Sequence, residues 1–278
     1  MIPYIVYSHT DFLDILLVQT HYLNSYENKI LLINKSDEDF SDLYSNYKKV
    51  IFYDDILPYA SRLLEIEKLN LDYALFIHDI DILVKKDDKF IEYFLEEMRE
   101  NDIERIDLQY KNNPKKNEKD MLLIDKYDNK FYLNPQLEAG PGEGDYIYNV
   151  GPSIWKISTL MEIMNHFKNE TYRTIEMGPT QIFCKDKGYK IYKCYWESYV
   201  NCGWCACMSF FQFIHITHHG KLLPLTGNNL NKSLVKTYDS ILKKFPLTDK
   251  RGFPEEFDKT HKEAKEYYHG PSTIKDWV

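Results

Sequence analysis

Four short apolar segments alternate with segments of helical periodicity over the first third of the 278-residue chain, and this alternation constrains the fold more than any other feature. The apolar segments span residues 3–7, 29–33, 49–53 and 73–77. Their length and their few polar residues are typical of strands that are buried on both faces. Because β-α-β connections are right-handed and favour parallel pairing, the alternation predicts a single α/β domain with a mixed, mainly parallel central sheet flanked by helices.

Two helices are expected between these strands. The inner face of the first is expected to hold residues that recur at helical spacing, namely Leu13, Leu16, Leu17 and Thr20. Thr10 or Asp11 is placed to cap this helix. The second can start at Pro58, because proline fits the first turn of a helix. Its inner face is expected to consist of Ala60, Leu63 and Leu64.

The fourth apolar segment runs directly into His78-Asp79-Ile80-Asp81. Side chains alternate along an extended segment, so Asp79 and Asp81 are expected on the same side, close together. Ligands of parallel α/β sheets bind beyond the carboxyl ends of the strands, and the residues from Ser8 to Thr10, which follow the first strand, are expected at the same edge. Two carboxylates are costly to bury together without a positive charge, so a divalent cation is their natural partner.

The alternative for this D-x-D motif is that both acids mark the solvated end of a strand. The chain contains a second D-x-D, Asp37-Glu38-Asp39, within the polar run NKSDEDFSD. The copy at 79–81 instead has apolar residues on both sides, which favours a buried site there.

The rest of the chain is expected to form further helices and strands around longer loops. The expected elements are a helix capped by Asp87 or Asp88, a strand around Ile106, a hairpin over 122–133, a Gly/Pro-rich loop over 134–145, and a last core strand that ends at His215. A helical C-terminal tail follows, with one amphipathic helix whose apolar face includes Leu234, Tyr238 and Ile241.

Composition narrows the class of protein. A net charge of -8 and a pI near 5.6 argue against nucleic acid or an anionic membrane as a partner. No apolar run approaches the length of a membrane span, and no charged leader precedes the first apolar residues. We therefore expect a cytoplasmic protein.

The five cysteines, an odd number, favour a reducing compartment over a disulfide framework. Cys202, Cys205 and Cys207 match part of a zinc-binding spacing, but a fourth ligand at ordinary spacing is absent. Small cysteines buried beside an apolar strand are the alternative interpretation.

Four segments together resemble the GT-A class of nucleotide-sugar glycosyltransferases, which have a Rossmann-like fold. They are the apolar strand that runs into D-x-D, NVGPSIWK at 149–156, IEMGPTQIFCKDKGYKIY at 175–192, and FIHITHHGK at 213–221. The resemblance implies a GT-A-like domain over 1–221, with a nucleotide-sugar half at 1–110 and an acceptor half at 111–221, and a helical extension over 222–278 packed on it. The bias toward Asn, Lys, Ile and Tyr suggests an AT-rich genome, and the chain also resembles uncharacterised glycosyltransferase-like proteins of large DNA viruses, which would place it in the host cytoplasm.

This resemblance implies the metal-dependent transfer of a sugar from a nucleotide-diphosphate donor to a hydroxyl group of a glycan, protein or lipid. Asp81 would bind Mn²⁺ or Mg²⁺, and Asp79 would contact the metal or the ribose. His215 or His218 would be the third protein ligand, and mixed oxygen and nitrogen ligands favour Mn²⁺. The cation would act as a Lewis acid toward the leaving diphosphate.

Other residues complete the expected site. Backbone donors from Ser8 through His9 and Thr10 to Asp11 are placed to approach the nucleotide. Arg62 is a candidate contact with a phosphate or base, and a salt-bridged structural arginine is the alternative.

An inverting enzyme also needs a base, whereas a retaining enzyme does not. Glu176, at an expected helix start, matches the acidic position of the family. Glu143 and Asp145 in the Gly/Pro-rich loop are second choices.

Two other classes of protein fit part of the pattern. A haloacid-dehalogenase-like phosphatase also binds Mg²⁺ at a D-x-D, but its motif follows the first strand and precedes a small residue and Thr or Val, whereas Asp81 precedes Ile82-Leu83. The other class is a non-catalytic binding or structural protein with a degenerate version of the same fold. Loss of the acids would mark that class, and both Asp79 and Asp81 are present.

Overall fold

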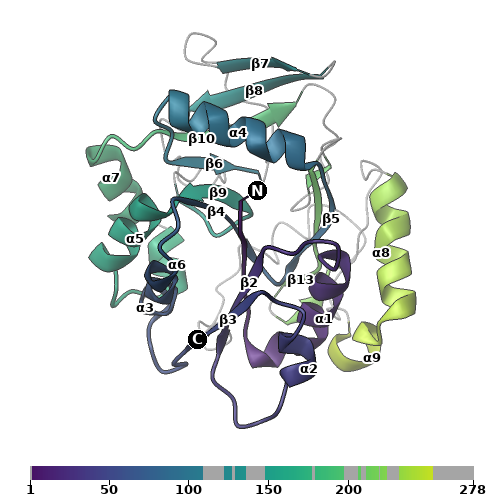
Figure 1. Cartoon of the computed structure of the whole chain (residues 1–278). Coiled ribbons are helices and arrows are strands. Elements are labelled where there is room, and N and C mark those ends of the chain that lie inside the picture. The colour runs from purple at the N-terminus through teal and green to yellow at the C-terminus, as the bar shows by residue number, and fades with distance from the viewer. Residues whose placement is uncertain are drawn as a thin grey trace.

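The structure, a computed structural model, describes residues 2–108, 122–126, 129–135, 148–176, 179–196, 206–207, 211–218, 220–223 and 232–252. Nine of the strands in these ranges form one sheet. In spatial order they are β3 (Lys49–Tyr53), β2 (Lys29–Asn34), β1 (Tyr4–Tyr7), β4 (Tyr73–His78), β9 (Ser153–Lys156), β6 (Arg105–Asp107), β10 (Ile191–Trp196), β8 (Asn129–Pro135) and β7 (Leu122–Lys126). The sheet runs from β3 near the bottom of Figure 1 to β7 at the top.

Most strands of this sheet run in one direction. β1 pairs in parallel with β2 and β4, β2 with β3, and β6 with β10. β9 and β8 are each antiparallel to both of their neighbours. The prediction of a mixed, mainly parallel α/β sheet is therefore confirmed, and the hairpin expected over 122–133 is the pair β7 and β8.

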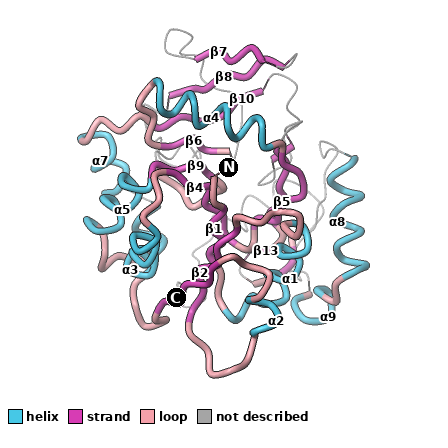
Figure 2. The backbone as a smooth tube through the Cα atoms, viewed as in Figure 1, coloured by secondary structure: helices cyan, strands magenta, loops and turns pink. Residues whose placement is uncertain are grey.

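Helices cover both faces of the sheet (Figure 2). The helices and short 3-10 helices of the described ranges are η1 (Thr10–Phe12), α1 (Leu13–Tyr22), α2 (Ser41–Tyr44), α3 (Tyr59–Leu63), η2 (Leu64–Leu69), α4 (Asp88–Glu100), α5 (Ile157–His166), α6 (Tyr172–Glu176), α7 (Pro179–Asp186), α8 (Lys232–Lys244) and α9 (Leu247–Arg251). Ile5 and Tyr7 of β1 share a core with α3, α5 and α6, whereas the alternate residues Tyr4 and Val6 share the opposite core with α1 and α4. None of these helices is both long and apolar enough to cross a membrane.

Two predicted helix starts are confirmed. Asp87 caps α4, because its carboxylate accepts a hydrogen bond from the amide of Lys89 over 3.0 Å. Pro58 immediately precedes α3, in which Ala60 and Leu63 are fully buried.

A turn separates the two acids of the D-x-D motif, so the prediction that both acids lie in one extended segment is wrong. β4 ends at His78, Asp79 and Ile80 form the turn, and β5 (Asp81–Lys86) begins at Asp81. β5 pairs with β12 (Phe211–His215) in a second sheet that β11 (Ala206–Cys207) completes, while β13 (Thr217–His218) pairs with β14 (Lys221–Leu222). The strand expected to end at His215 is confirmed, and it lies in this small sheet.

The described part of the C-terminal segment packs on α1 and on the small sheet, to the right in Figure 1. Leu234 and Tyr238 of α8 share a buried cluster with Ile15 of α1 and Ile214 of β12. The predicted amphipathic helix is therefore confirmed. The division of the chain into a domain over residues 1–221 and a separate extension over 222–278 stays a prediction.

The inner face of α1 differs from the prediction. Leu16 is fully buried, but Leu17 is 50% exposed. The helix is covered by the central sheet on one side and by α8 and the small sheet on another, so Ile15 and Val18 are buried in place of Leu17. A single-face helical pattern does not anticipate this second layer of packing.

Leu16→Ala is expected to lower the free energy of unfolding by about 2–5 kcal/mol, because it removes buried methyl groups and leaves a cavity. Leu17→Ala, on the same helix, is expected to cost less than about 1 kcal/mol, since its side chain already faces solvent. Urea unfolding followed by circular dichroism measures both changes. Equal losses in the two variants would contradict this orientation of α1.

Candidate functional site

The carboxyl ends of β1 and β4 meet at one edge of the central sheet. Tyr7 and His78 are partners in the parallel pair, so Ser8 and Asp79 leave the two strands at the same level. The Ser8 hydroxyl donates to Oδ2 of Asp79 over 2.5 Å, and the Asp79 amide donates to the Tyr7 carbonyl over 2.9 Å. The prediction that Ser8 and Asp79 share this edge is confirmed.

Asp79 is held in a buried environment and is only 5% exposed. Burial disfavours the charged carboxylate and raises the pKa of Asp79 to about 7. Hydrogen bonds from the Ser8 hydroxyl and from the amides of Ile80 and His9 oppose this shift. The Asp79 carboxylate is therefore shielded from water and is held by hydrogen bonds from fixed donors.

Asp81 and His215 form the second part of the site. They face each other in the antiparallel pair of β5 and β12. Nδ1 of His215 donates to Oδ1 of Asp81 over 2.7 Å, and both residues are buried. Directly opposite residues in such a pair have Cβ atoms about 5 Å apart, so the register itself brings the two side chains into contact. The fold thus joins residues that are 134 positions apart.

The segment that follows β1 is held by local side-chain bonds. His9 caps the 3-10 helix η1, because its Nδ1 accepts from the amide of Asp11 over 3.1 Å. The prediction that Thr10 or Asp11 is the cap is therefore wrong: the His9 ring turns back over the helix start. Asn34 at the end of β2 accepts from the Thr10 amide over 2.8 Å.

These bonds occupy the amides that were expected to approach a nucleotide. The Ser8 amide donates to the carbonyl of Leu32 over 2.9 Å, and the His9 amide donates to Asp79. The Thr10 and Asp11 amides are bonded within the protein as described above. The carbonyl groups of Ser8 to Asp11 also accept hydrogen bonds from within the protein, so the segment offers a ligand its side chains and not a row of free amides.

Arg62 is bound to the turn that follows β3. Its Nε donates to the Leu57 carbonyl over 2.7 Å, and a terminal nitrogen donates to the Asp55 carbonyl over 2.5 Å. The other terminal nitrogen is 3.2 Å from the Asp55 carboxylate, which also accepts from Nε2 of His9 over 3.0 Å. These contacts match the alternative of a salt-bridged arginine, and a contact with a phosphate or base stays a prediction.

His78 is a residue of the site that the sequence reasoning missed. The Tyr59 hydroxyl is hydrogen-bonded to Nε2 of His78 over 2.9 Å, and the ring centroids of Tyr7 and Tyr172 lie 5.0 Å and 6.3 Å from the imidazole. Burial lowers the pKa of His78 to about 3, and the nearby His215 adds to this effect, so the ring is neutral. The available signal was a polar residue that closes an apolar strand just before D-x-D.

Glu176 ends α6, so the prediction that it opens a helix is wrong. The helix start lies at Pro179, which suits the first turn of α7. Oε1 of Glu176 accepts from the Val150 amide over 3.0 Å, and the Tyr172 hydroxyl is hydrogen-bonded to the same carboxylate. The negative charges of Glu176 and Asp81 both add to the effect of burial, which raises the pKa of Tyr172.

Several predicted residues lie outside the part of the chain that the structure describes, namely Glu143, Asp145, Cys202 and Cys205. His218 lies in β13 and Cys207 in β11.

The donor atoms at this edge fit the chemistry of Mn²⁺ or Mg²⁺. Asp79 and Asp81 present carboxylate oxygens and His215 an imidazole, a mixed set that suits Mn²⁺. The 2.7 Å contact between Nδ1 of His215 and Oδ1 of Asp81 is a hydrogen bond, so a metal ion bound through these two atoms would replace it. Within the described residues, no three His, Cys, Asp or Glu side chains already form a metal-binding cluster.

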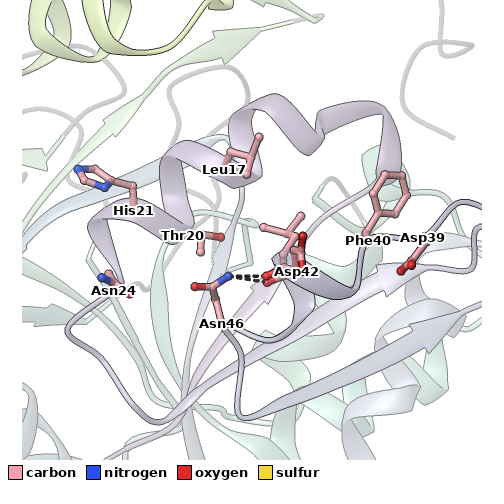
Figure 3. Close-up of a pocket in the computed structure, with 9 residues that line it drawn as sticks. Leu17, Thr20, His21, Asn24, Asp39, Phe40, Asp42 and Asn46 are labelled. Atoms are coloured by element: carbon pink, nitrogen blue, oxygen red, sulfur yellow. Dashed lines mark hydrogen bonds between the residues drawn. The ribbon is translucent and has the colours of Figure 1, made fainter.

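A separate pocket of about 490 Å³ lies between α1 and α2 (Figure 3). Its lining includes Leu17, His21, Phe40, Asp42 and Asn46, and none of its lining residues belongs to the D-x-D edge. The second D-x-D, at 37–39, is exposed in the loop before α2.

No protein-family model matches the sequence, and no curated protein matches it. Among solved structures, the chain is similar to a cytidylyltransferase from Leptospira borgpetersenii, with 10% identity and a TM-score of 0.39 over 71% of this chain and 76% of that one. It is similar to a UDP-glucose pyrophosphorylase complexed with UDP-glucose, with 11% identity and a TM-score of 0.41 over 72% and 93% of the two chains. It is also similar to TarS from S. aureus, with 13% identity and a TM-score of 0.37 over 69% and 58%. Likeness at this level does not establish a shared function.

Tyr59→Phe is expected to lower the free energy of unfolding by about 1–3 kcal/mol, because Nε2 of His78 loses its hydroxyl partner inside the protein. Ser61→Ala on the same helix removes an exposed hydroxyl bond to the Lys168 carbonyl. It is expected to cost about 0.5 kcal/mol or less. Urea unfolding compares the stabilities of the two variants. Equal stabilities would contradict a stabilising hydrogen bond between Tyr59 and His78.

Proposed function

We propose that this protein is a metal-dependent glycosyltransferase that uses a nucleotide-diphosphate sugar. The observation that supports this most is the pairing of Asp79 with Ser8 and of Asp81 with His215 at one buried edge of the fold. Ligands of open parallel α/β sheets bind beyond the carboxyl ends of their strands, which is where these pairs lie. The sugar would pass to a hydroxyl group of a glycan, protein or lipid.

Asp81 and His215 are the proposed ligands of Mn²⁺ or Mg²⁺, with Asp79 as a further ligand or as a contact with the ribose. His218 is the alternative third ligand. When bound, the cation would supply Lewis-acid stabilisation of the charge on the leaving diphosphate. The two carboxylates compensate its charge in a region shielded from water, where an unpaired ion would be costly.

Ser8, His9, Thr10 and Arg62 are the proposed contacts with the donor. The His9 ring is fixed from both nitrogens, and the Thr10 hydroxyl accepts from Nδ2 of Asn34 over 2.9 Å. Side chains that are already held in one orientation lose less entropy when a ligand binds.

Glu176 is the proposed base if the enzyme inverts configuration. The Val150 amide and the Tyr172 hydroxyl both donate to its carboxylate and hold it in one orientation. In the proposed role this carboxylate would accept a proton from an acceptor hydroxyl. A retaining enzyme would not need this role.

Mn²⁺ together with a UDP-sugar or a GDP-sugar is expected to raise the thermal unfolding midpoint of the wild type. A ligand at one hundred times its Kd stabilises a protein by about 2.7 kcal/mol. Asp81→Asn is expected to abolish the metal-dependent part of the shift, whereas Asp37→Asn, the same change in the exposed D-x-D, is expected to retain it. A well-folded wild type that shows no shift with any sugar nucleotide would contradict the proposal.

Glu176→Gln is expected to lower kcat by about 100-fold or more, because it removes the base, and to leave the KM for the donor nearly unchanged. Release of the nucleoside diphosphate from the donor measures this. An unchanged kcat would exclude Glu176 as the base. Formation of pyrophosphate from a nucleoside triphosphate and a sugar phosphate would instead indicate nucleotidyl transfer, and hydrolysis of a simple phosphate ester would indicate a phosphatase.

A further inference from the structure

Arg251, the last residue of α9, binds the segment that follows β1. Its Nε and one terminal nitrogen donate to the two carboxylate oxygens of Asp14 over 2.7 Å and 2.5 Å. The same terminal nitrogen donates to the Asp11 carbonyl over 2.9 Å, and the guanidinium lies 4.6 Å from the centre of the Phe12 ring. One side chain therefore holds η1 and the first turn of α1.

Arg251 also contacts the other side of the candidate site. Its remaining terminal nitrogen donates to the Gly220 carbonyl over 3.3 Å, in the turn between β13 and β14. Next to it, the Leu222 amide donates to the Gly252 carbonyl over 3.0 Å. The arginine thus joins α9 to the two segments that carry Ser8 and His218.

The burial and the geometry of the ion pair between Arg251 and Asp14 favour a positioning role for Arg251. The side chains of Arg251 and Asp14 are only 7% and 15% exposed, so solvent screens their interaction weakly. A two-point arginine–carboxylate pair fixes direction as well as distance, which a lysine in the same place does not. Arg251 is also within electrostatic reach of Asp79, whose hydrogen-bond donor Ser8 begins the held segment.

We propose that Arg251 is a positioning residue for the donor site. It holds the Ser8–Phe12 segment against α9, and in this way the C-terminal segment sets how tightly a nucleoside diphosphate binds. The effect on ligand binding rests on the proposed function. The effect of Arg251 on the Ser8–Phe12 segment can be measured without a ligand.

The test compares the wild type with Arg251→Lys, Asp14→Asn and the control Lys250→Gln. Lys250 is the neighbouring cation, but its side chain is 58% exposed and its nitrogen is 3.9 Å from Asp14. Hydrogen exchange is followed at the Thr10, Asp11 and Phe12 amides, with amides of β2 and β4 as the reference for folding. Calorimetric titration with UDP and with GDP, each with Mn²⁺, measures the Kd.

Arg251→Lys is expected to speed amide hydrogen exchange in this segment at least tenfold and to raise the Kd for the nucleotide about tenfold, with a smaller change in kcat. Asp14→Asn is expected to do the same, and the double variant to add little, because both changes remove one pair. Lys250→Gln is expected to match the wild type.

Unchanged exchange at the three amides in both Arg251→Lys and Asp14→Asn would overturn the inference. Faster exchange with an unchanged Kd would show that Arg251 holds the segment but does not affect how tightly the nucleotide binds, and would overturn that part of the proposal. A wild type that binds neither nucleotide would contradict the proposed function, and exchange at the three amides would then still decide whether Arg251 holds the segment.

Discussion

The candidate site depends on the registers of two strand pairs. In the central sheet Tyr7 lies opposite His78, and in the small sheet His215 lies opposite Asp81. A slip of one residue in either pair would turn its side chains to the other face, and the contacts made by Ser8 or by His215 would be lost. Both registers are enforced by burial, since β1, β4 and the start of β5 have almost no exposed residues. The site is therefore a consequence of how the two sheets meet at the Asp79–Ile80 turn.

The buried acids at this junction are costly for the fold. A buried ion pair is on average no more stabilising than well-packed apolar side chains of similar volume. Here Asp79 accepts from Ser8, Asp81 accepts from His215, and Asp14 accepts from Arg251 close by. Two buried acids where the two sheets meet and a third on α1, each with a specific donor, are difficult to explain by packing alone. They are understandable where a charged ligand binds, which is the physical basis for proposing a function there.

Local patterns explain what the sequence predicted well. The first four strands and the Asp87 cap follow from runs of apolar residues and from helix-end chemistry, which depend on neighbours in the chain. The position of Leu17 was mispredicted because a second layer of packing covers α1 from the far side. Glu176 was misplaced because it is the last residue of α6, and the next helix, α7, begins at Pro179.

The candidate site was predictable only in part. Ser8 and Asp79 come directly after β1 and β4, so their common edge follows from topology, and Asp81 lies two residues further on, where β5 begins. Arg251 lies 237 positions from Asp14, and no local pattern indicates which acid a distant arginine will bind. His78 was missed for the same reason, since its partner Tyr59 comes from a separate helix.

In the proposed function, a divalent cation binds at the D-x-D edge together with the diphosphate of the donor. Anomalous diffraction at the manganese absorption edge, from crystals grown with Mn²⁺ and a nucleoside diphosphate, locates the ion directly. We predict one strong peak in contact with the Asp81 carboxylate and with an oxygen of the diphosphate, beside Asp79 and His215. A bound nucleotide with no manganese at this edge, or manganese ordered only at other acids such as 37–39, would contradict it.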